Sequence, residues 1–273
     1  MRRDPTALSR TPFDLLVIGA GIHGACAAWD AALRGLTVAL VDQEDFGAGT
    51  SANSLRIVHG GLRYLTRGNL AQMRESIRER STLLRIAPGL VQPLPVLVPV
   101  YGIGLRGRLA LGAALALNDL TSWGRNRDLD PGRLIPPGRL VSREECLQLF
   151  PGFAVEGLTG GALWYDGQLL HPERLTLCFV QAAADLGTVA ANYVRVDRLR
   201  SGNGTVQGAR VTDRLTGAEF DVEARAVLVA AGPWTSTVLA TLPGATPQLR
   251  TSPARALGLN LVLGRRLADV AVG

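Results

Sequence analysis

The sequence predicts an α/β fold in which a buried parallel sheet continues into an antiparallel one. An apolar strand at 14–19, a glycine turn, a helix at 22–34 and a second apolar strand at 37–42 follow one another directly. This order and spacing are typical of a Rossmann-like βαβ unit. From about residue 189 onward, apolar and polar residues alternate between short polar turns, which is typical of antiparallel strands.

The rest of the chain supplies further helices and strands. A Gly/Ser/Thr-rich loop at 47–61 precedes an amphipathic helix from Asn69 to about Ile86. The proline-rich stretch at 87–100 interrupts the pattern, and we expect it to carry the chain into another layer or domain. Later helices are expected at 105–120, after the capping box Ser142–Glu145, and at 171–186, and later strands at 189–196, 205–212, 218–223, 225–232 and 257–263.

Composition narrows the class of protein. The 273 residues are 47% hydrophobic and 19% charged, an ordinary globular balance. The apolar segment at 105–117 is too short to span a bilayer, and it fits either peripheral membrane contact or a buried helix. Residues 1–11 lack the apolar core of a secretory signal, so a cytoplasmic protein is expected.

Charge and cysteine content restrict the ligands. The net charge of +6 fits a small anionic substrate or anionic lipid, but no basic run is interleaved with aromatics, so nucleic-acid binding is not expected. Neither a disulfide framework nor a metal site is expected, because the three cysteines are widely separated: Cys26, Cys146 and Cys178.

Three glycines between the first strand and the first helix carry the main binding prediction. Gly19, Gly21 and Gly24 form G-x-G-x-x-G, in which they permit a tight turn, close backbone approach to a pyrophosphate, and close helix–strand packing. Phosphates are then expected at the helix N-terminus. Asp42 ends the second strand, 18 positions after Gly24, and is expected to accept hydrogen bonds from ribose hydroxyls. These residues predict a dinucleotide site without distinguishing FAD from NAD.

Two later motifs resemble a known family. TSANSLRIVHGGLRYL at 50–65 and VAAGPW at 229–234 resemble FAD-dependent glycerol-3-phosphate dehydrogenases, which are D-amino-acid-oxidase-like flavoproteins. The resemblance implies FAD as cofactor. It also implies a Rossmann-like FAD-binding domain of the glutathione-reductase-like, D-amino-acid-oxidase type, joined to a partial antiparallel substrate domain.

The resemblance also implies roles for individual residues. Arg63 would face the substrate, and its guanidinium suits a phosphate or a developing alkoxide. Tyr64 would line the substrate pocket or pack beneath it. His59, between Val58 and two glycines, is expected to be structural rather than the catalytic base. Residues expected to contact the cofactor, with Trp234 mainly packing, are Thr50, Ser51, Ser54, Gly60, Gly61, Gly232 and Trp234.

The implied reaction is oxidation of sn-glycerol 3-phosphate to dihydroxyacetone phosphate. A hydride passes from C2 to flavin N5, and a quinone reoxidises the flavin at the inner face of the membrane. Where the family has a histidine in G-x-H, this chain has Asn260. Asparagine can hydrogen-bond a substrate hydroxyl but cannot accept its proton, so either another group is the base or the substrate differs.

Two other functions stay open. One is an oxidase of an amine, amino acid or other hydroxy acid, favoured by Asn260; the other is an inactive FAD-binding fragment. The resemblance implies that this chain corresponds to the N-terminal half of a family member. The expected domains are an FAD-binding domain at 12–90 and 156–240, a substrate or cap segment at 91–155, and the start of a substrate-domain sheet at 241–273.

Overall fold

The computed structural model describes residues 1–102, 107–246 and 258–273. The chain forms two compact units. The first unit contains residues 1–54 and 171–260, and the second contains residues 55–170 and 261–273.

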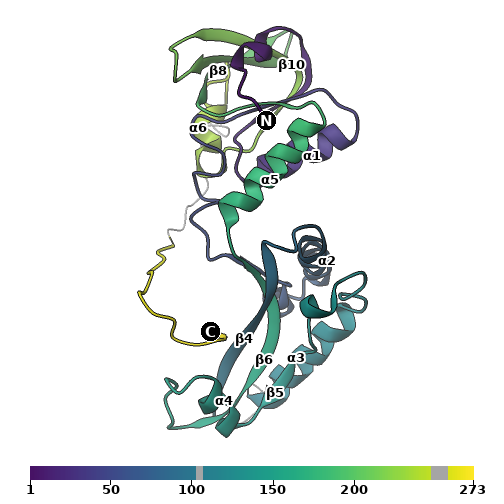
Figure 1. The fold of residues 1–273 in the computed structure, drawn as a ribbon, viewed down its shortest axis with the longest axis vertical. Coiled ribbons are helices and arrows are strands. Elements are labelled where there is room, and N and C mark those ends of the chain that lie inside the picture. Colours follow the sequence, from purple (N-terminus) through teal and green to yellow (C-terminus); the bar gives the residue numbers. More distant parts are fainter. Residues whose placement is uncertain (103–106, 247–257) are drawn as a thin grey trace. The chain divides into compact units, whose positions relative to one another are not determined.

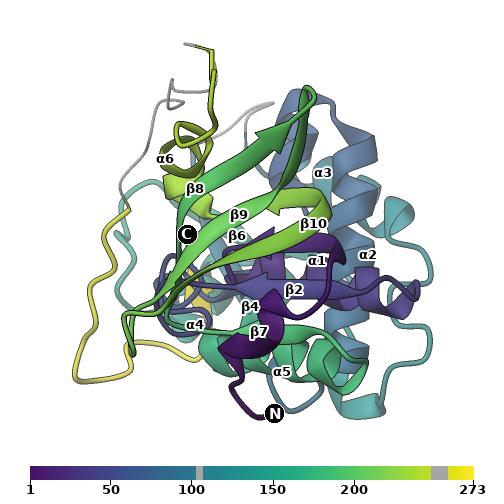
Figure 2. The ribbon, with the colours of Figure 1, turned by 90° about the horizontal axis from the view of Figure 1, so that it is seen from above.

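The first unit is built on a six-stranded sheet in the order β7-β2-β1-β10-β9-β8. Its central strand β1 (Phe13–Ile18) pairs in parallel with β2 (Val38–Val41) on one side and β10 (Glu219–Val229) on the other. The parallel part ends with β7 (Val189–Ala191). The antiparallel part, visible in Figure 2, contains β9 (Thr205–Asp213) and β8 (Val194–Gly202).

Two helices lie side by side in the first unit (Figure 1). They are α1 (Ile22–Leu33) and α5 (Pro172–Asp185), and the ring centroids of Trp29 and Phe179 lie 5.3 Å apart between them. Short elements complete the unit: η1 (Pro5–Ser9), η4 (Gly232–Trp234) and α6 (Thr235–Leu239). Apolar residues of both parts of the sheet form one core, including Leu16, Val41, Val211 and Val222. The predicted α/β fold class is confirmed.

The second unit contains a five-stranded sheet in the order β11-β4-β6-β3, with β5 also paired to β6. Its two long strands are β4 (Val91–Tyr101) and β6 (Leu158–Leu169). The short strands are β3 (Ile57–Val58), β5 (Arg139–Val141) and β11 (Ala271–Val272). The helical segments are η2 (Leu62–Arg67), α2 (Leu70–Ile86), α3 (Arg108–Thr121), η3 (Pro131–Arg133) and α4 (Arg143–Leu149). Helices α2 and α3 lie together beside the sheet (Figure 1).

The proline-rich stretch forms strand β4, whereas the sequence suggested an interruption. Pro93, Pro95 and Pro99 are separated by even numbers of residues. Because backbone groups of alternate residues point to opposite edges of a strand, the positions that lack an N–H all lie along the same edge. Leu97 lies on the same edge as these prolines, and its carbonyl accepts the Gly273 N–H, just after β11, at 3.1 Å. The proline edge therefore faces β11 and points away from β6. The alternate residues of β4 keep their N–H groups and can pair with β6.

Strand β6 was not predicted from the sequence because glycines interrupt its apolar pattern. At Gly161, a Cβ would lie 2.6 Å from Cys146 Sγ of α4, and at Gly167 it would lie 3.1 Å from Val58 Cβ of β3. These glycines therefore reflect close packing of neighbouring elements on the strand.

Two other expectations differ from the structure. Residues 258–263 form no strand and are exposed, so the predicted last strand is wrong there; Leu257 lies outside the described residues. The units change at 54/55 and 170/171, whereas the expected boundaries lay at 90/91 and 155/156. Antiparallel pairing of β6 with β4 and β3 keeps 55–90 and 156–170 with the second unit.

Most other elements match their predicted spans. The Ser142 hydroxyl accepts the Glu145 N–H at 3.1 Å, which confirms the capping box, and Asn69 caps α2 through the Gln72 N–H. Residues 105 and 106 lie outside the described residues, and the rest of the apolar segment lies largely in α3. In this helix Leu115 is buried, but Leu109 and Leu120 are exposed. Within the described ranges, every helix is too short or too polar to cross a membrane.

An ion pair fixes the N-terminal segment to the sheet of the first unit. Arg3 donates to Asp213 with 2.6 Å between Nη2 and Oδ1, and its Nε donates to the Asn192 carbonyl at 3.0 Å. The Asp213 side chain is only 2% exposed and also accepts the Leu215 N–H. The hydrogen bond from Arg3 lowers the pKa of Asp213 below its usual value.

We expect this pair to make stability sensitive to acid. Because the folded-state pKa of Asp213 is lowered, its contribution is complete above the unfolded pKa of 3.8 and is lost as the pH falls through the lower folded value. Denaturant unfolding from pH 6 to about pH 3 measures this. Asp213→Asn should lower the free energy of unfolding at pH 6 and reduce its pH dependence; an unchanged slope would contradict this role.

Candidate functional site

The glycine turn of the first unit lies where β1 meets α1. Gly19 has φ +102°, and a Cβ there would lie 2.6 Å from the Ala230 carbonyl oxygen at the end of β10. A Cβ at Gly24 would lie 1.8 Å from the Gly19 carbonyl oxygen. Both positions therefore require glycine, and the short contacts seat the start of α1 against the ends of two parallel strands.

The loop after β2 returns to the N-terminus of α1. The Ser51 hydroxyl accepts the Ile22 N–H at 2.9 Å, and a Cβ at Gly21 would lie 2.9 Å from the same oxygen. Ser51 thus lies where a phosphate bound at this helix terminus would be, and its hydroxyl proton remains available for donation.

Asp42 accepts hydrogen bonds from the glycine turn and from the loop that follows β2. Its Oδ2 accepts the Ala20 N–H at 2.7 Å, and its Oδ1 accepts the Glu44 N–H at 2.9 Å. Burial raises the pKa of Asp42, while these two hydrogen bonds act in the opposite direction. Each carboxylate oxygen has a further acceptor position, which suits the two hydroxyls of a ribose.

The VAAGPW segment at 229–234 contacts the loop that follows β2. Gly232 has φ +51°, and the Trp234 ring lies 3.3 Å from where a Cβ of Gly49 would be. Trp234 therefore packs on the loop beside Thr50 while staying 49% exposed. Asn260 Nδ2 donates to the Ser54 carbonyl at 3.5 Å, a long bond between exposed residues.

The HGGLRY segment lies in the second unit. Gly61 has φ +78°, and its carbonyl accepts the Tyr64 N–H at 2.8 Å, which begins η2. The Arg63 guanidinium lies 5.3 Å from the centroid of the Tyr64 ring, close enough for a cation–π contact. The ring centroids of His59 and Tyr64 lie 5.8 Å apart, and the angle between the two ring planes is 70°, an edge-to-face arrangement.

Two residues that the sequence reading missed hold this segment. Asp166 Oδ1 accepts the Gly60 N–H at 2.6 Å and also accepts from Arg80 Nη1 at 3.1 Å. Arg80 is 2% exposed, and desolvation lowers the pKa of its guanidinium despite the opposing effect of Asp166. The sequence did contain a signal for Arg80. This arginine lies at a position of the apolar stripe of α2, which also contains Met73, Ile77 and Leu84.

The predicted residues therefore form two groups, each within one unit. The second unit contains Gly60, Gly61, Arg63 and Tyr64. The first unit contains Gly19, Gly21, Gly24, Asp42, Thr50, Ser51, Ser54, Gly232, Trp234 and Asn260.

The first group has the geometry of a dinucleotide-binding protein: a parallel sheet, a glycine turn at its carboxyl edge, a helix N-terminus and a partly buried carboxylate. The model of the FAD dependent oxidoreductase family matches residues 14–267, and the chain belongs to this family. FAD rather than NAD is thereby confirmed as the cofactor of the class. The residues present fit this cofactor, because Ser51 lies at the start of α1 and each oxygen of Asp42 keeps a further acceptor position beside the glycine turn.

Several curated relatives are named glycerol-3-phosphate dehydrogenase. The chain is 39% identical over 241 residues to a glycerol-3-phosphate dehydrogenase of Synechocystis, covering 87% of this chain and 42% of that protein. It is 37% identical over 246 residues to the human mitochondrial glycerol-3-phosphate dehydrogenase, covering 85% and 32%. The chain thus spans less than half the length of these relatives. The predicted resemblance to this family is confirmed.

Solved structures agree with the fold. The glycerol-3-phosphate dehydrogenase of Bacillus halodurans complexed with FAD aligns with a TM-score of 0.62 and 28% identity, covering 85% of this chain and 36% of that one. L-proline dehydrogenase of P. horikoshii aligns with a TM-score of 0.63 at 16% identity, covering 84% and 55%, and shows the fold alone.

Asp42→Ala tests the cofactor cradle. We expect FAD to bind about 10- to 100-fold more weakly, because charge-assisted hydrogen bonds contribute about 1.5–3 kcal/mol. Fluorescence titration of the cofactor-free chain with FAD measures the change. Asp30→Ala is the control, because Asp30 forms an exposed ion pair with Arg34 on the same helix. Equal affinities for the two variants would exclude Asp42 from the site.

Proposed function

We propose that this chain takes part in the FAD-dependent oxidation of sn-glycerol 3-phosphate to dihydroxyacetone phosphate. The observation that carries the proposal is the set of relatives named glycerol-3-phosphate dehydrogenase, which are 37–39% identical over more than four fifths of this chain. Oxidation removes a hydride from C2 and a proton from its hydroxyl. FAD supplies the hydride acceptor.

Arg63 is assigned to the substrate. Its position directly after the glycine turn, with the guanidinium against the Tyr64 ring, gives it a defined direction rather than that of a loose surface side chain. A guanidinium stabilises both a phosphate and the negative charge that develops on the carbinol oxygen. Asn260 would hydrogen-bond the substrate hydroxyl, leaving proton removal to a different group.

The proposed electron acceptor is a membrane quinone, and α3 supplies a surface for peripheral membrane contact. One side of this helix packs inward through Leu115, while its other side exposes Leu109 by 79% and Leu120 by 68%. Trp123, just after the helix, is 89% exposed. Exposed apolar side chains of this size fit the interfacial region of a bilayer.

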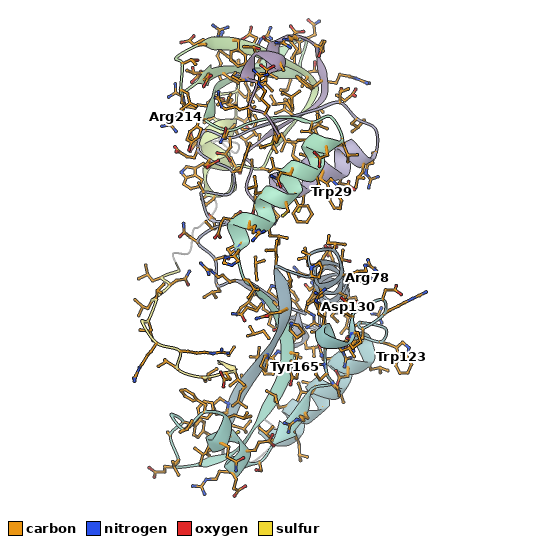
Figure 3. The ribbon with its side chains drawn as sticks, viewed as in Figure 1. Trp29, Arg78, Trp123, Asp130, Tyr165 and Arg214 are labelled. Atoms are coloured by element: carbon orange, nitrogen blue, oxygen red, sulfur yellow. The ribbon has the colours of Figure 1, made fainter. Side chains whose placement is uncertain are left out.

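A basic groove of about 440 Å³ adjoins this apolar surface within the second unit. Its lining includes Arg74, Arg78, Arg85, Arg127 and Trp123, and its one acidic lining residue among the described residues is Asp128. Figure 3 shows Arg78 and Trp123 on the same side of the unit. Arginines beside exposed apolar residues suit the phosphate groups of anionic lipids.

Anaerobic mixing of the FAD-loaded chain with substrates tests the proposed reaction. Glycerol 3-phosphate should reduce the flavin and bleach its absorbance, and a quinone analogue should restore the absorbance. A D-amino-acid-oxidase-like function, which Asn260 favours, predicts bleaching by an amine, amino acid or other hydroxy acid instead. Bleaching by these compounds alone would overturn the glycerol 3-phosphate assignment.

Arg63→Ala should lower kcat/KM for glycerol 3-phosphate by about 10- to 100-fold, because a charge-assisted interaction in the transition state is lost. Steady-state kinetics with a dye acceptor measures this. Arg34→Ala, which removes an exposed arginine of α1, is the matched control and should leave kcat/KM within about twofold. A similar small change for Arg63→Ala would remove it from the substrate site.

Vesicle sedimentation tests the membrane surface. The chain should bind vesicles containing anionic phospholipid more than neutral ones, and salt should weaken the binding. Trp123→Ala and Arg78→Gln should each reduce the bound fraction, whereas Arg225→Gln, on the sheet of the first unit, should not. Equal binding by all of these proteins would contradict a role for α3 and its groove.

A further inference from the structure

We propose that Arg80 is the positioning residue of the glycine turn His59–Gly61 and acts through Asp166 to fix the segment that carries Arg63 and Tyr64. The inference rests on the proposed function for the role of Arg63 in substrate binding. It assigns to Arg80 and Asp166 a task in the site although neither belongs to a recognisable motif.

Arg80 is held at the centre of the second unit. Its Nη1 donates to the Tyr165 carbonyl at 2.7 Å and to Asp166 Oδ1 at 3.1 Å, both on β6. Tyr165 is labelled on this strand in Figure 3. The residue comes from the buried stripe of α2, so its guanidinium joins the helix to the sheet.

Asp166 connects this pair to the glycine turn. The oxygen that accepts from Arg80 also accepts the Gly60 N–H at 2.6 Å, while Trp164 Nε1 donates to the other oxygen at 3.3 Å. The Asp166 side chain is 13% exposed, so its charge relies on these donors rather than on water. The backbone of the turn is thus fixed by a carboxylate that Arg80 itself holds in place.

Gly60 shows how closely the guanidinium approaches the turn. A Cβ at this position would lie 2.2 Å from Arg80 Nη1 and 2.6 Å from Cζ. The φ of Gly60 lies outside the left-handed region, unlike that of Gly61 at +78°. The backbone at Gly60 would therefore accept a side chain, and Arg80 is what excludes one. The sequence resemblance placed this glycine among the residues that contact the cofactor, which is a different reason.

Burial of the Arg80 guanidinium makes an unfavourable contribution to the free energy of folding. Arg80 Nε and Nη2 are buried without a hydrogen-bond partner among the described residues, and an apolar side chain would fill this stripe of α2 without that desolvation cost. A charge at this position is better explained by what it holds than by a contribution to stability. Arg80→Met removes this cost but leaves Asp166 only the Gly60 N–H and Trp164 Nε1 as donors, so the variant should be less stable than the wild type.

A double-mutant cycle separates the two explanations of Gly60. The four proteins are the wild type, Gly60→Ala, Arg80→Met and the double variant, compared by kcat/KM for glycerol 3-phosphate and by amide hydrogen exchange of residue 60. Gly60→Ala alone should lower kcat/KM roughly tenfold or more and speed exchange. In the Arg80→Met background it should change either quantity less than about twofold.

Arg80→Met itself should speed exchange at Gly60, and Arg80→Lys should restore part of the protection because it keeps a positive charge beside Asp166. If Arg80→Met does not fold by circular dichroism, Arg80→Lys and Asp166→Asn take its place in the cycle. Arg139→Met is the matched control, since it removes an exposed bidentate pair with Glu145 in the same unit and should leave exchange at Gly60 unchanged.

Two results would overturn the inference. One is an equal penalty for Gly60→Ala in both backgrounds, which would mean that something other than Arg80 requires the glycine. The other is normal exchange at Gly60 in Arg80→Met. Failure of the proposed function looks different: the wild type would not oxidise glycerol 3-phosphate, while exchange at Gly60 would still depend on Arg80.

Discussion

The close approach of α1 to the end of β1 is the constraint on which the rest of the first unit depends. The Gly19 carbonyl lies where a Cβ of Gly24 would otherwise be, so the helix begins directly against the strand. The Ala230 N–H donates to the Ile18 carbonyl at 2.8 Å, which brings the end of β10 to the same point from the far part of the sequence. Three backbone segments converge there, and their convergence places Asp42 and Ser51 around one helix N-terminus.

Gly60 is required for a different physical reason from Gly19 and Gly24. In the first unit, Gly19 and Gly24 lie against backbone carbonyls, which cannot move without displacing a strand. In the second unit, Gly60 lies against the end of a side chain, Arg80. A backbone obstacle is a property of the fold, whereas a side-chain obstacle can be removed by substitution. Gly19 and Gly24 are therefore requirements of the fold, whereas Gly60 is a requirement of one buried ion pair.

Local patterns predicted the first unit well because its signals are local. Strand β1, helix α1 and strand β2 each carry their own periodicity, and the glycines between them have fixed spacing. The second unit depends on distant pairing. Prolines in β4 are tolerated because they lie along one edge of the strand, and glycines in β6 are needed because α4 and β3 pack closely on it. Neither reason can be inferred from the neighbouring residues in the sequence. Residues 258–263 show the opposite case, since an apolar run without a partner strand stays extended and exposed. The place of Asp42 beside the glycine turn followed from spacing, whereas that of Asp166 beside Gly60 could not, because the two residues are 106 positions apart.

An FAD site at the glycine turn of the first unit depends on the short contact between helix α1 and strand β1. Titration of the wild type, Gly24→Ala and Gly89→Ala with FAD tests it most directly. A Cβ at Gly24 would lie 1.8 Å from the Gly19 oxygen, while one at Gly89 would meet nothing within 4 Å. The wild type and Gly89→Ala should take up FAD with equal affinity, and Gly24→Ala should lose FAD binding. Equal FAD binding by Gly24→Ala, or none by the wild type, would contradict it.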